Sequence, residues 1–199
     1  FALMGYIAEA DGKVTRDEIA MAEQVMSQMR LSEQQRVVAK NLFNEGKKAN
    51  FPVHEVLAQF KRECFRRRNL IQMFLEIVTV TAFADGKMDD AERIILEGIA
   101  KDLGYTPAQF KALLSRLSGQ AHFMHDESSA DKLKAAYGLL GIKKSASDAE
   151  LKKAYRKQMN QHHPDKLVAK GLPEEMIDIA TEKTQEIKAA YEMIKSTRK

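Results

Sequence analysis

A histidine, a proline and an aspartate stand together at His163, Pro164 and Asp165, where an imidazole and a carboxylate could bind a metal ion or contact a partner. Proline ends the preceding helix, because it lacks an N–H group and pushes the residue before it out of the α region. The two polar side chains are therefore predicted to lie in a tight exposed loop. A metal site that adds His162 is disfavoured, since adjacent side chains seldom converge on one ion and no cysteine or further histidine accompanies them.

The helix that precedes this loop must position it. Ser147 and Glu150 have the spacing of a capping box, which predicts a helix running to about His162. Its basic residues recur at i, i+1, i+4 and i+5 and therefore share one face: Lys152, Lys153, Arg156 and Lys157. A second helix, from about Glu174 to Lys195, has a matching apolar stripe, so the two should pair as an antiparallel hairpin with the loop at its tip. This arrangement suits docking on an acidic protein surface, since complementary charge speeds association and fixes register.

Helical periodicity extends over almost the whole chain, which has ten glycines and four prolines in 199 residues and no sustained strand alternation. The predicted fold class is all-α. The segment Ala10–Lys13 recurs as Ala84–Lys87, and Glu18 recurs at the same spacing as Glu92. The repeat also contains two candidate capping boxes: Ser32 with Gln35, and Thr106 with Gln109. Residues 1–117 are therefore predicted to form one domain of two related helical units.

The periodicity fails in the polar run SGQAHFMHDESS, so we expect a linker over residues 118–130 and a second domain over 131–199. Residues 130–199 hold 15 of the 32 Lys and Arg residues but only 10 of the 28 Asp and Glu residues. The net charge of +4 thus resides in the C-terminal part. The single cysteine, Cys64, cannot form an internal disulfide and supplies too few ligands for zinc, which fits a reducing compartment.

The C-terminal part resembles the J domain of DnaJ-type co-chaperones. The resemblance rests on YGLLGI at 137–142, ELKKAYRK at 150–157, HPD at 163–165 and EIKAAYE at 186–192, in this order. It implies that the HPD tripeptide triggers ATP hydrolysis by a DnaK-type chaperone, with no cofactor bound by this chain. It also implies that one set of residues provides electrostatic docking, with a tyrosine that packs or contacts the partner: Lys152, Lys153, Arg156, Lys157 and Lys166, with Tyr155.

Three features depart from the common J-domain pattern. Gln158 falls where a buried leucine is usual, so Met159 is expected to fill that space after a small rotation. The loop from Leu167 to Pro173 is longer than in many relatives, and the chain ends in STRK where many J domains continue with a fourth helix. These differences concern the packing more than the activity.

The order of the parts resembles the membrane-anchored DnaJ-like proteins of Gram-negative bacteria, and residues 1–117 then resemble the TerB-like helical fold. The paired ADGK motifs and the segment HHPDKLVAKGLP near the C-terminal end carry this resemblance. It implies a transmembrane segment before Phe1, a location at the inner membrane with this region facing the cytoplasm, and a homodimer formed mainly through that segment.

The repeated carboxylates invite a metal-binding hypothesis: Asp11 with Glu18, and Asp85 with Glu92. An EF-hand loop needs oxygen ligands at alternating positions and a glutamate at the twelfth, and neither copy has them. The favoured interpretation is that the glycine turns the chain and the acidic residues cap the next helix. A metal-binding or signalling TerB-like module stays open as an alternative function.

Two other classes of function receive less support. The basic C-terminal domain could bind nucleic acid, although its charge excess favours an acidic protein partner over specific nucleic-acid binding. An enzyme is not expected, because the sequence shows no nucleophile with a base, no phosphate-binding glycine loop and no metal ligand set. The cluster in KRECFRRR either contacts lipid head groups or is a solvated helix face: Lys61, Arg62, Arg66, Arg67 and Arg68.

Overall fold

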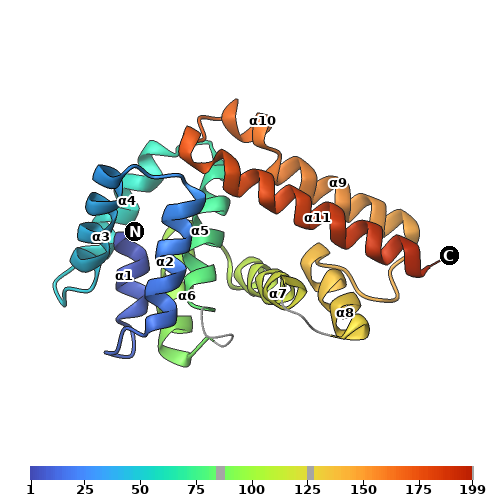
Figure 1. The fold of residues 1–199 in the computed structure, drawn as a ribbon, viewed down its shortest axis with the longest axis horizontal. Helices are drawn as coiled ribbons and strands as arrows, with labels where there is room; N and C mark the ends of the chain where they lie inside the picture. The colour runs from blue at the N-terminus through green and yellow to red at the C-terminus, as the bar shows by residue number, and fades with distance from the viewer. Residues whose placement is uncertain (84–87, 125–127, 199) are drawn as a thin grey trace. The chain divides into compact units, whose positions relative to one another are not determined.

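Helices provide all the regular secondary structure in the computed structural model, which describes residues 1–83, 88–124 and 128–198 (Figure 1). No strand occurs within these ranges, so the all-α prediction is confirmed. The chain divides into two compact units, Phe1–Phe110 and Lys111–Lys199. None of the helices in the described ranges is long and apolar enough to cross a membrane.

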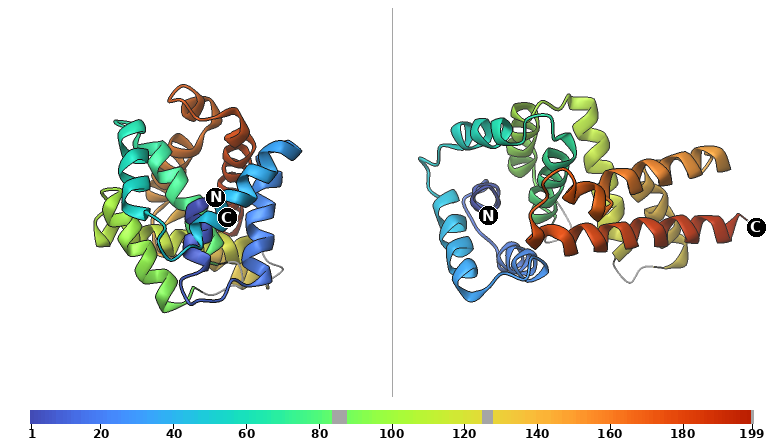
Figure 2. Two further views of the ribbon diagram at one scale, coloured as in Figure 1. Left: turned by 90° about the vertical axis from the view of Figure 1, so that its left-hand side faces the viewer. Right: turned by 90° about the horizontal axis from the view of Figure 1, so that it is seen from above.

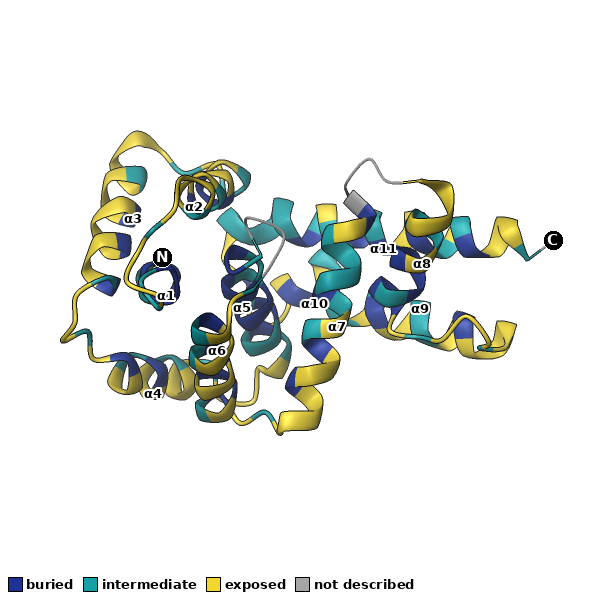
Figure 3. Cartoon of the chain, turned by 90° about the horizontal axis from the view of Figure 1, so that it is seen from below, coloured by how far each residue is buried: buried dark blue, intermediate teal, exposed yellow. Residues whose placement is uncertain are grey.

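The first unit is built around a short helix, α1 (Ala2–Ala8), whose sequence ALMGYIA has no charged side chain. Figures 2 and 3 show α1 end-on with the other helices of the unit around it. An apolar helix can be buried on most of its sides without leaving a charge unpaired. The surrounding helices are α2 (Arg16–Gln28), α3 (Glu33–Gly46), α4 (Val53–Glu63), α5 (Arg68–Thr81) and α6 (Asp90–Asp102).

The contact between α1 and α3 depends on two glycines. A Cβ atom on Gly5 would lie 1.9 Å from the carbonyl oxygen of Phe43, and one on Gly46 would lie 1.8 Å from the carbonyl oxygen of Ala2. Both neighbours are backbone atoms, which cannot rotate away as a flexible side chain can. The close approach of the two helices therefore requires glycine at both positions.

Replacement of Gly5 by alanine is expected to destabilise the first unit by about 3 kcal/mol, because α1 and α3 must move apart. The matched control is Gly98→Ala in α6, where an added Cβ meets nothing within 4 Å. That change should stabilise the unit by about 0.5–1 kcal/mol, since alanine is the better helix former. Calorimetric unfolding of the two variants would test this, and equal effects of both would contradict the glycine contact.

Capping boxes begin several helices of the first unit. Thr15 with Glu18 starts α2, and Asp89 with Glu92 starts α6, in each case with reciprocal hydrogen bonds between side chain and backbone. The predicted box of Ser32 and Gln35 is confirmed at the start of α3. The predicted pair of Thr106 and Gln109 makes the same two bonds, at 2.9 and 3.3 Å, at the start of α7 (Pro107–Met124). These local signals explain why the two halves of the repeat start their helices at matching positions.

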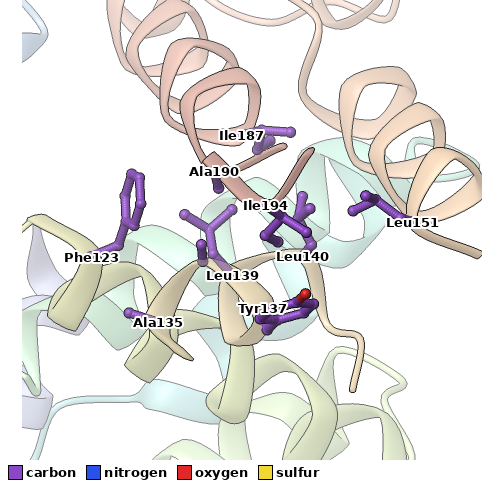
Figure 4. Close-up of a cluster of buried hydrophobic side chains, with 10 residues drawn as sticks. Phe123, Ala135, Tyr137, Leu139, Leu140, Leu151, Ile187, Ala190 and Ile194 are labelled. Carbon is purple, nitrogen blue, oxygen red and sulfur yellow. The ribbon is translucent and has the colours of Figure 1, made fainter. Parts of the chain in front are cut away.

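The second unit contains the predicted hairpin. Helix α9 (Asp148–His162) packs along α11 (Ile177–Thr197), and the two lie side by side in Figures 1 and 2. The short helices α10 (Pro164–Val168) and η1 (Glu174–Met176) connect α9 to α11 at one end of the hairpin. Helix α8 (Ser129–Leu140) packs against both α9 and α11. Figure 4 shows the core in which side chains of α7, α8, α9 and α11 meet: Phe123, Ala135, Tyr137, Leu139, Leu140, Leu151, Ile187, Ala190 and Ile194.

The sequence predicted a linker over residues 118–130, and the structure corrects this. Helix α7 continues to Met124 and α8 begins at Ser129, so most of the polar run is helical. A Cβ atom on Gly119 would lie 2.7 Å from the carbonyl carbon of Gly138, so the glycine lets α7 press closely against α8. Phe123 is 8% exposed and belongs to the core of the second unit. Burial of this helix face therefore stabilises a segment whose sequence lacks an obvious helical period.

Candidate functional site

The HPD tripeptide lies at the junction of α9 and α10. His163 ends α9, its backbone N–H donating to the carbonyl oxygen of Met159 at 2.9 Å, and it also caps α10, because its Nδ1 accepts the backbone N–H of Asp165 at 3.2 Å. The His163 side chain is 42% exposed and that of Asp165 is 91% exposed. The prediction that these two side chains are presented to solvent is confirmed.

Pro164 begins the short helix α10, which also contains Asp165, rather than the loop expected from the sequence. Pro164 occupies the first turn of α10, where its missing N–H is not needed and its fixed φ suits a helix. The fully buried Leu167 anchors α10, and the N–H of Leu172 returns to the Leu167 carbonyl oxygen at 2.9 Å. Gly171, with a φ of 84°, makes the turn that allows this return. The tripeptide is therefore held in an ordered segment that the buried Leu167 fixes to the rest of the second unit.

Helix α9 has both buried and exposed residues, as the colours along it in Figure 3 show, and its buried residues are Leu151, Gln158 and His162. The four predicted docking cations are all exposed: Lys152, Lys153, Arg156 and Lys157. Lys166 is exposed too, and its Nζ donates to the Oδ1 of Asn160, which places its ammonium group beside the last turns of α9. Cations thus lie both along α9 and directly beside the HPD tripeptide.

Tyr155 contributes mainly to packing in the structure. Its ring stacks on that of Tyr191 in α11, with 4.2 Å between the ring centroids and 20° between the planes. Such offset aromatic pairs stabilise beyond the area that they bury. Tyr155 is half-buried, so part of the residue stays accessible.

Gln158 is itself buried at the interior position, so Met159 does not replace it as expected but packs, partly buried, against the core beside it. Gln158 is 5% exposed, and its Oε1 accepts a hydrogen bond of 2.9 Å from Nη1 of Arg116 in α7. A buried amide needs such a partner, because an unpaired one loses its hydration without compensation. Sequence reasoning missed Arg116. The signal that could have revealed it was a polar residue at an apolar position of the hairpin, which requires a polar partner elsewhere.

His162 faces the interior, next to the exposed His163. It is 2% exposed, and its Nδ1 lies 3.0 Å from the backbone oxygen of Gln158. The neighbouring imidazoles therefore occupy different environments, which supports the rejection of a joint metal site at this end of the hairpin.

A half-buried carboxylate links α11 to α7. Glu186 accepts a hydrogen bond from Nε2 of Gln120, and burial raises its pKa above the ordinary glutamate value, an effect that Lys183 and Gln120 partly oppose. A raised pKa means that the charged form is disfavoured in the folded protein. Glu186 therefore reduces the stability of the second unit once it is ionised.

We expect the variant Glu186→Gln to be more stable than the native chain at pH 7. Glutamine keeps an oxygen for Gln120 but removes the buried charge. As the pH falls through the raised pKa the native carboxylate takes up a proton, so the advantage of the variant should shrink and vanish below the ordinary glutamate pKa. Melting temperatures of both proteins over this pH range provide the test. An advantage that persists in acid would contradict the desolvation argument.

The carboxylates considered for a metal site act within their own turns. Asp11 accepts the N–H of Lys13 at 2.8 Å, Glu18 accepts that of Thr15 at 2.7 Å, and Glu92 accepts that of Asp89 at 2.9 Å. Asp85 lies outside the described residues. Over the parts of the chain that are described, no three metal-ligating side chains come together. The helix-capping interpretation is confirmed for the two glutamates.

An antiparallel helical hairpin with an exposed HPD tip and a cationic helix defines a J-domain protein. The comparisons with known families agree: the DnaJ domain matches residues 135–199, and the family described as tellurite resistance protein TerB matches residues 1–115. The chain belongs to the DjlA family of co-chaperone proteins.

The relatives match along nearly the whole chain. Co-chaperone protein DjlA of Shewanella oneidensis is 48% identical over 200 residues, covering 100% of this chain and 76% of the relative. Its namesake from Photobacterium profundum is 43% identical over 207 residues, covering 98% of this chain and 75% of the relative. That of Salmonella paratyphi A is also 43% identical, over 206 residues. No solved structure matches the chain.

Proposed function

We propose that this protein is a co-chaperone that recruits a DnaK-type chaperone and stimulates its ATP hydrolysis. The observation that carries the proposal is the HPD tripeptide, ordered and exposed at the end of a helix whose outer face is cationic. The DjlA relatives support the same role.

The cations of α9 and the HPD tripeptide contribute to binding in different ways. Exposed cations along α9 attract an acidic surface and set the register of docking, because long-range charge acts mainly on the association rate. The tripeptide then makes short-range polar contacts. The hydrolytic chemistry belongs to the partner, and the protein acts as a non-enzymatic regulator that needs no cofactor.

We also propose that the protein works at the bacterial inner membrane, with this region facing the cytoplasm, and that a preceding segment anchors it and favours a homodimer. The support is the family membership. An apolar segment of about 20 residues encoded upstream of Phe1 would agree with this, since that length spans a bilayer. Its absence would contradict the anchor.

Single-turnover ATP hydrolysis by a purified DnaK-type chaperone tests the main proposal. The rate should rise with the concentration of this protein and reach a plateau, which indicates a saturable complex. A rate that does not change at any concentration would contradict the proposed function.

Charge on α9 should control how fast the complex forms. The double variant Lys153→Gln, Lys157→Gln is expected to reduce the association rate constant by roughly threefold to tenfold and to weaken its dependence on salt. The plateau rate of hydrolysis should change little, because the tripeptide is intact. Stopped-flow or surface-binding kinetics at several salt concentrations would measure this.

The matched control for that variant is Lys143→Gln, Lys144→Gln, which removes the same charge. Both lysines are exposed and precede α9, at the opposite end of a helix about 20 Å long from the tripeptide. If the control lost association rate equally, net charge alone would determine the rate, and the proposal of a docking face on α9 would be contradicted.

A further inference from the structure

The turn between α4 and α5, two helices labelled in Figure 1, exposes an aromatic side chain next to several arginines. Phe65 is 71% exposed, the largest value for any large apolar side chain in the described ranges. Four arginines surround it in sequence, and all are exposed: Arg62, Arg66, Arg67 and Arg68. We call Phe65 and these four arginines the α4–α5 patch. Within the described part of the chain, none of the four guanidinium groups forms an ion pair with a carboxylate.

The exposure of Phe65 does not come from a frayed segment. Its N–H donates to the carbonyl oxygen of Arg62 at 3.2 Å, and the N–H of Arg67 donates to that of Cys64 at 2.9 Å. The guanidinium carbon of Arg66 lies 5.3 Å from the centre of the Phe65 ring, on its face. The backbone thus holds the ring and a cation together on the outside of the turn.

The patch also works against local stability. Arg66 has a φ of 62°, a conformation that glycine or asparagine adopts at lower cost. Arg67 and Arg68 stand at the N-terminus of α5, which has no side-chain cap and no acidic residue in its first turn. The helix dipole disfavours cations at this end. Residues that break local folding preferences together, at an exposed position, indicate a role other than folding.

An anionic lipid surface matches both components of the patch. Cations near such a surface are attracted to lipid phosphates, while a phenylalanine can enter the boundary between head groups and acyl chains. A soluble acidic partner would need an apolar pocket for the ring in addition to carboxylates for the arginines, whereas an anionic lipid surface offers both everywhere along it. A single-stranded nucleic acid could use the ring for stacking, yet it usually needs a longer cationic track along its backbone.

We propose that the α4–α5 patch binds an anionic phospholipid surface, with Phe65 inserted at the interface and the arginines on lipid phosphates. This goes beyond the co-chaperone function and does not rest on it. The binding is a property of the first unit alone, whereas the HPD tripeptide and the basic helix lie in the second.

The test uses the whole chain and vesicles made either of phosphatidylcholine alone or of equal parts phosphatidylcholine and phosphatidylglycerol. Flotation should recover the protein with the anionic vesicles only. The double variant Arg66→Gln, Arg67→Gln should bind roughly 25-fold more weakly, at about fivefold per cation. Phe65→Ser should bind about tenfold more weakly, because it cannot bury an apolar ring. Circular dichroism confirms that these exposed substitutions leave the fold intact.

A fluorescent reporter distinguishes insertion from simple charge attraction. The chain has no tryptophan, so Phe65→Trp places the only indole at the patch. Its emission should shift to shorter wavelength with the anionic vesicles and stay unchanged with phosphatidylcholine alone. No shift despite flotation would overturn the insertion of residue 65.

The control variant Lys152→Gln, Lys153→Gln removes the same charge from α9 and should float like the native chain. An equal loss in this control would show that net charge drives binding and would overturn the proposal. Tight binding to a single-stranded DNA oligonucleotide that depends on Arg66 and Arg67, with no binding to vesicles, would assign the patch to nucleic acid instead. Stimulation of ATP hydrolysis is measured without lipid, so either proposal can fail while the other stands.

Discussion

Asparagine in place of His163 is expected to abolish the stimulation of a DnaK-type chaperone while leaving α10 in place. The side-chain oxygen of asparagine can accept the N–H of Asp165, as Nδ1 of His163 does at 3.2 Å, and asparagine is among the best N-cap residues. The variant therefore removes the imidazole ring but keeps the cap. If the ring is a central contact of the complex, its loss should weaken productive binding by about 30-fold or more.

The readout is the single-turnover rate of ATP hydrolysis at several concentrations of the variant, together with its melting temperature. The control is His122→Asn, which changes an exposed histidine of α7 and should leave stimulation at the native level. Native stimulation by the His163→Asn protein would remove His163 from the proposed trigger. A fall in melting temperature with no fall in stimulation would assign the histidine to structure only.

Alanine in place of Gly119 should open the second unit. A Cβ atom there would lie 2.7 Å from both the carbonyl carbon of Gly138 and the amide nitrogen of Leu139, so α7 and α8 would have to separate. Separation would also disturb the hydrogen bonds that α7 makes with α9 and α11, through Arg116 and Gln120. We expect a destabilisation of about 3 kcal/mol.

Because the chain has two units, an unfolding curve alone does not show which helices the added Cβ loosens. Hydrogen exchange resolved by segment avoids this, and protection should fall in α8 and α11 of the Gly119→Ala protein while α1 to α6 keep theirs. The Gly98→Ala protein serves as control, with protection retained throughout. Unchanged protection of α8 would show that its contact with α7 does not contribute to the second unit.

Local chemistry accounts for the parts of the fold that the sequence predicted well. The start of α9 follows from the capping box of Ser147 and Glu150, and its end from Pro164, so the predicted end at His162 is confirmed. The proline was interpreted only as a stop, whereas it also begins α10, because the same ring that ends one helix suits the first turn of the next.

The remaining features depend on residues far apart in the chain. Arg116 hydrogen-bonds to Gln158, which is 42 residues away in the sequence, and Gln120 hydrogen-bonds to Glu186, which is 66 residues away. Helices α7 and α8 pack closely at Gly119 because this residue has no side chain. A glycine contact of this kind adds nothing to the hydrophobic periodicity by which a helix is recognised in a sequence. A polar stretch with one glycine therefore resembled a linker, although its role is to complete the core beside the J domain. The roles of the HPD residues and of the cations on α9 remain predictions.

The capping bond of His163 has a consequence for the chemistry of recognition. Since Nδ1 accepts the N–H of Asp165, the ring hydrogen of the neutral tautomer is on Nε2. The tip of the hairpin thus offers a partner one directional donor from the imidazole and, close by, the acceptor oxygens of Asp165. A partner that contacts both groups would need an acceptor for the Nε2–H of His163 and a donor for the carboxylate of Asp165.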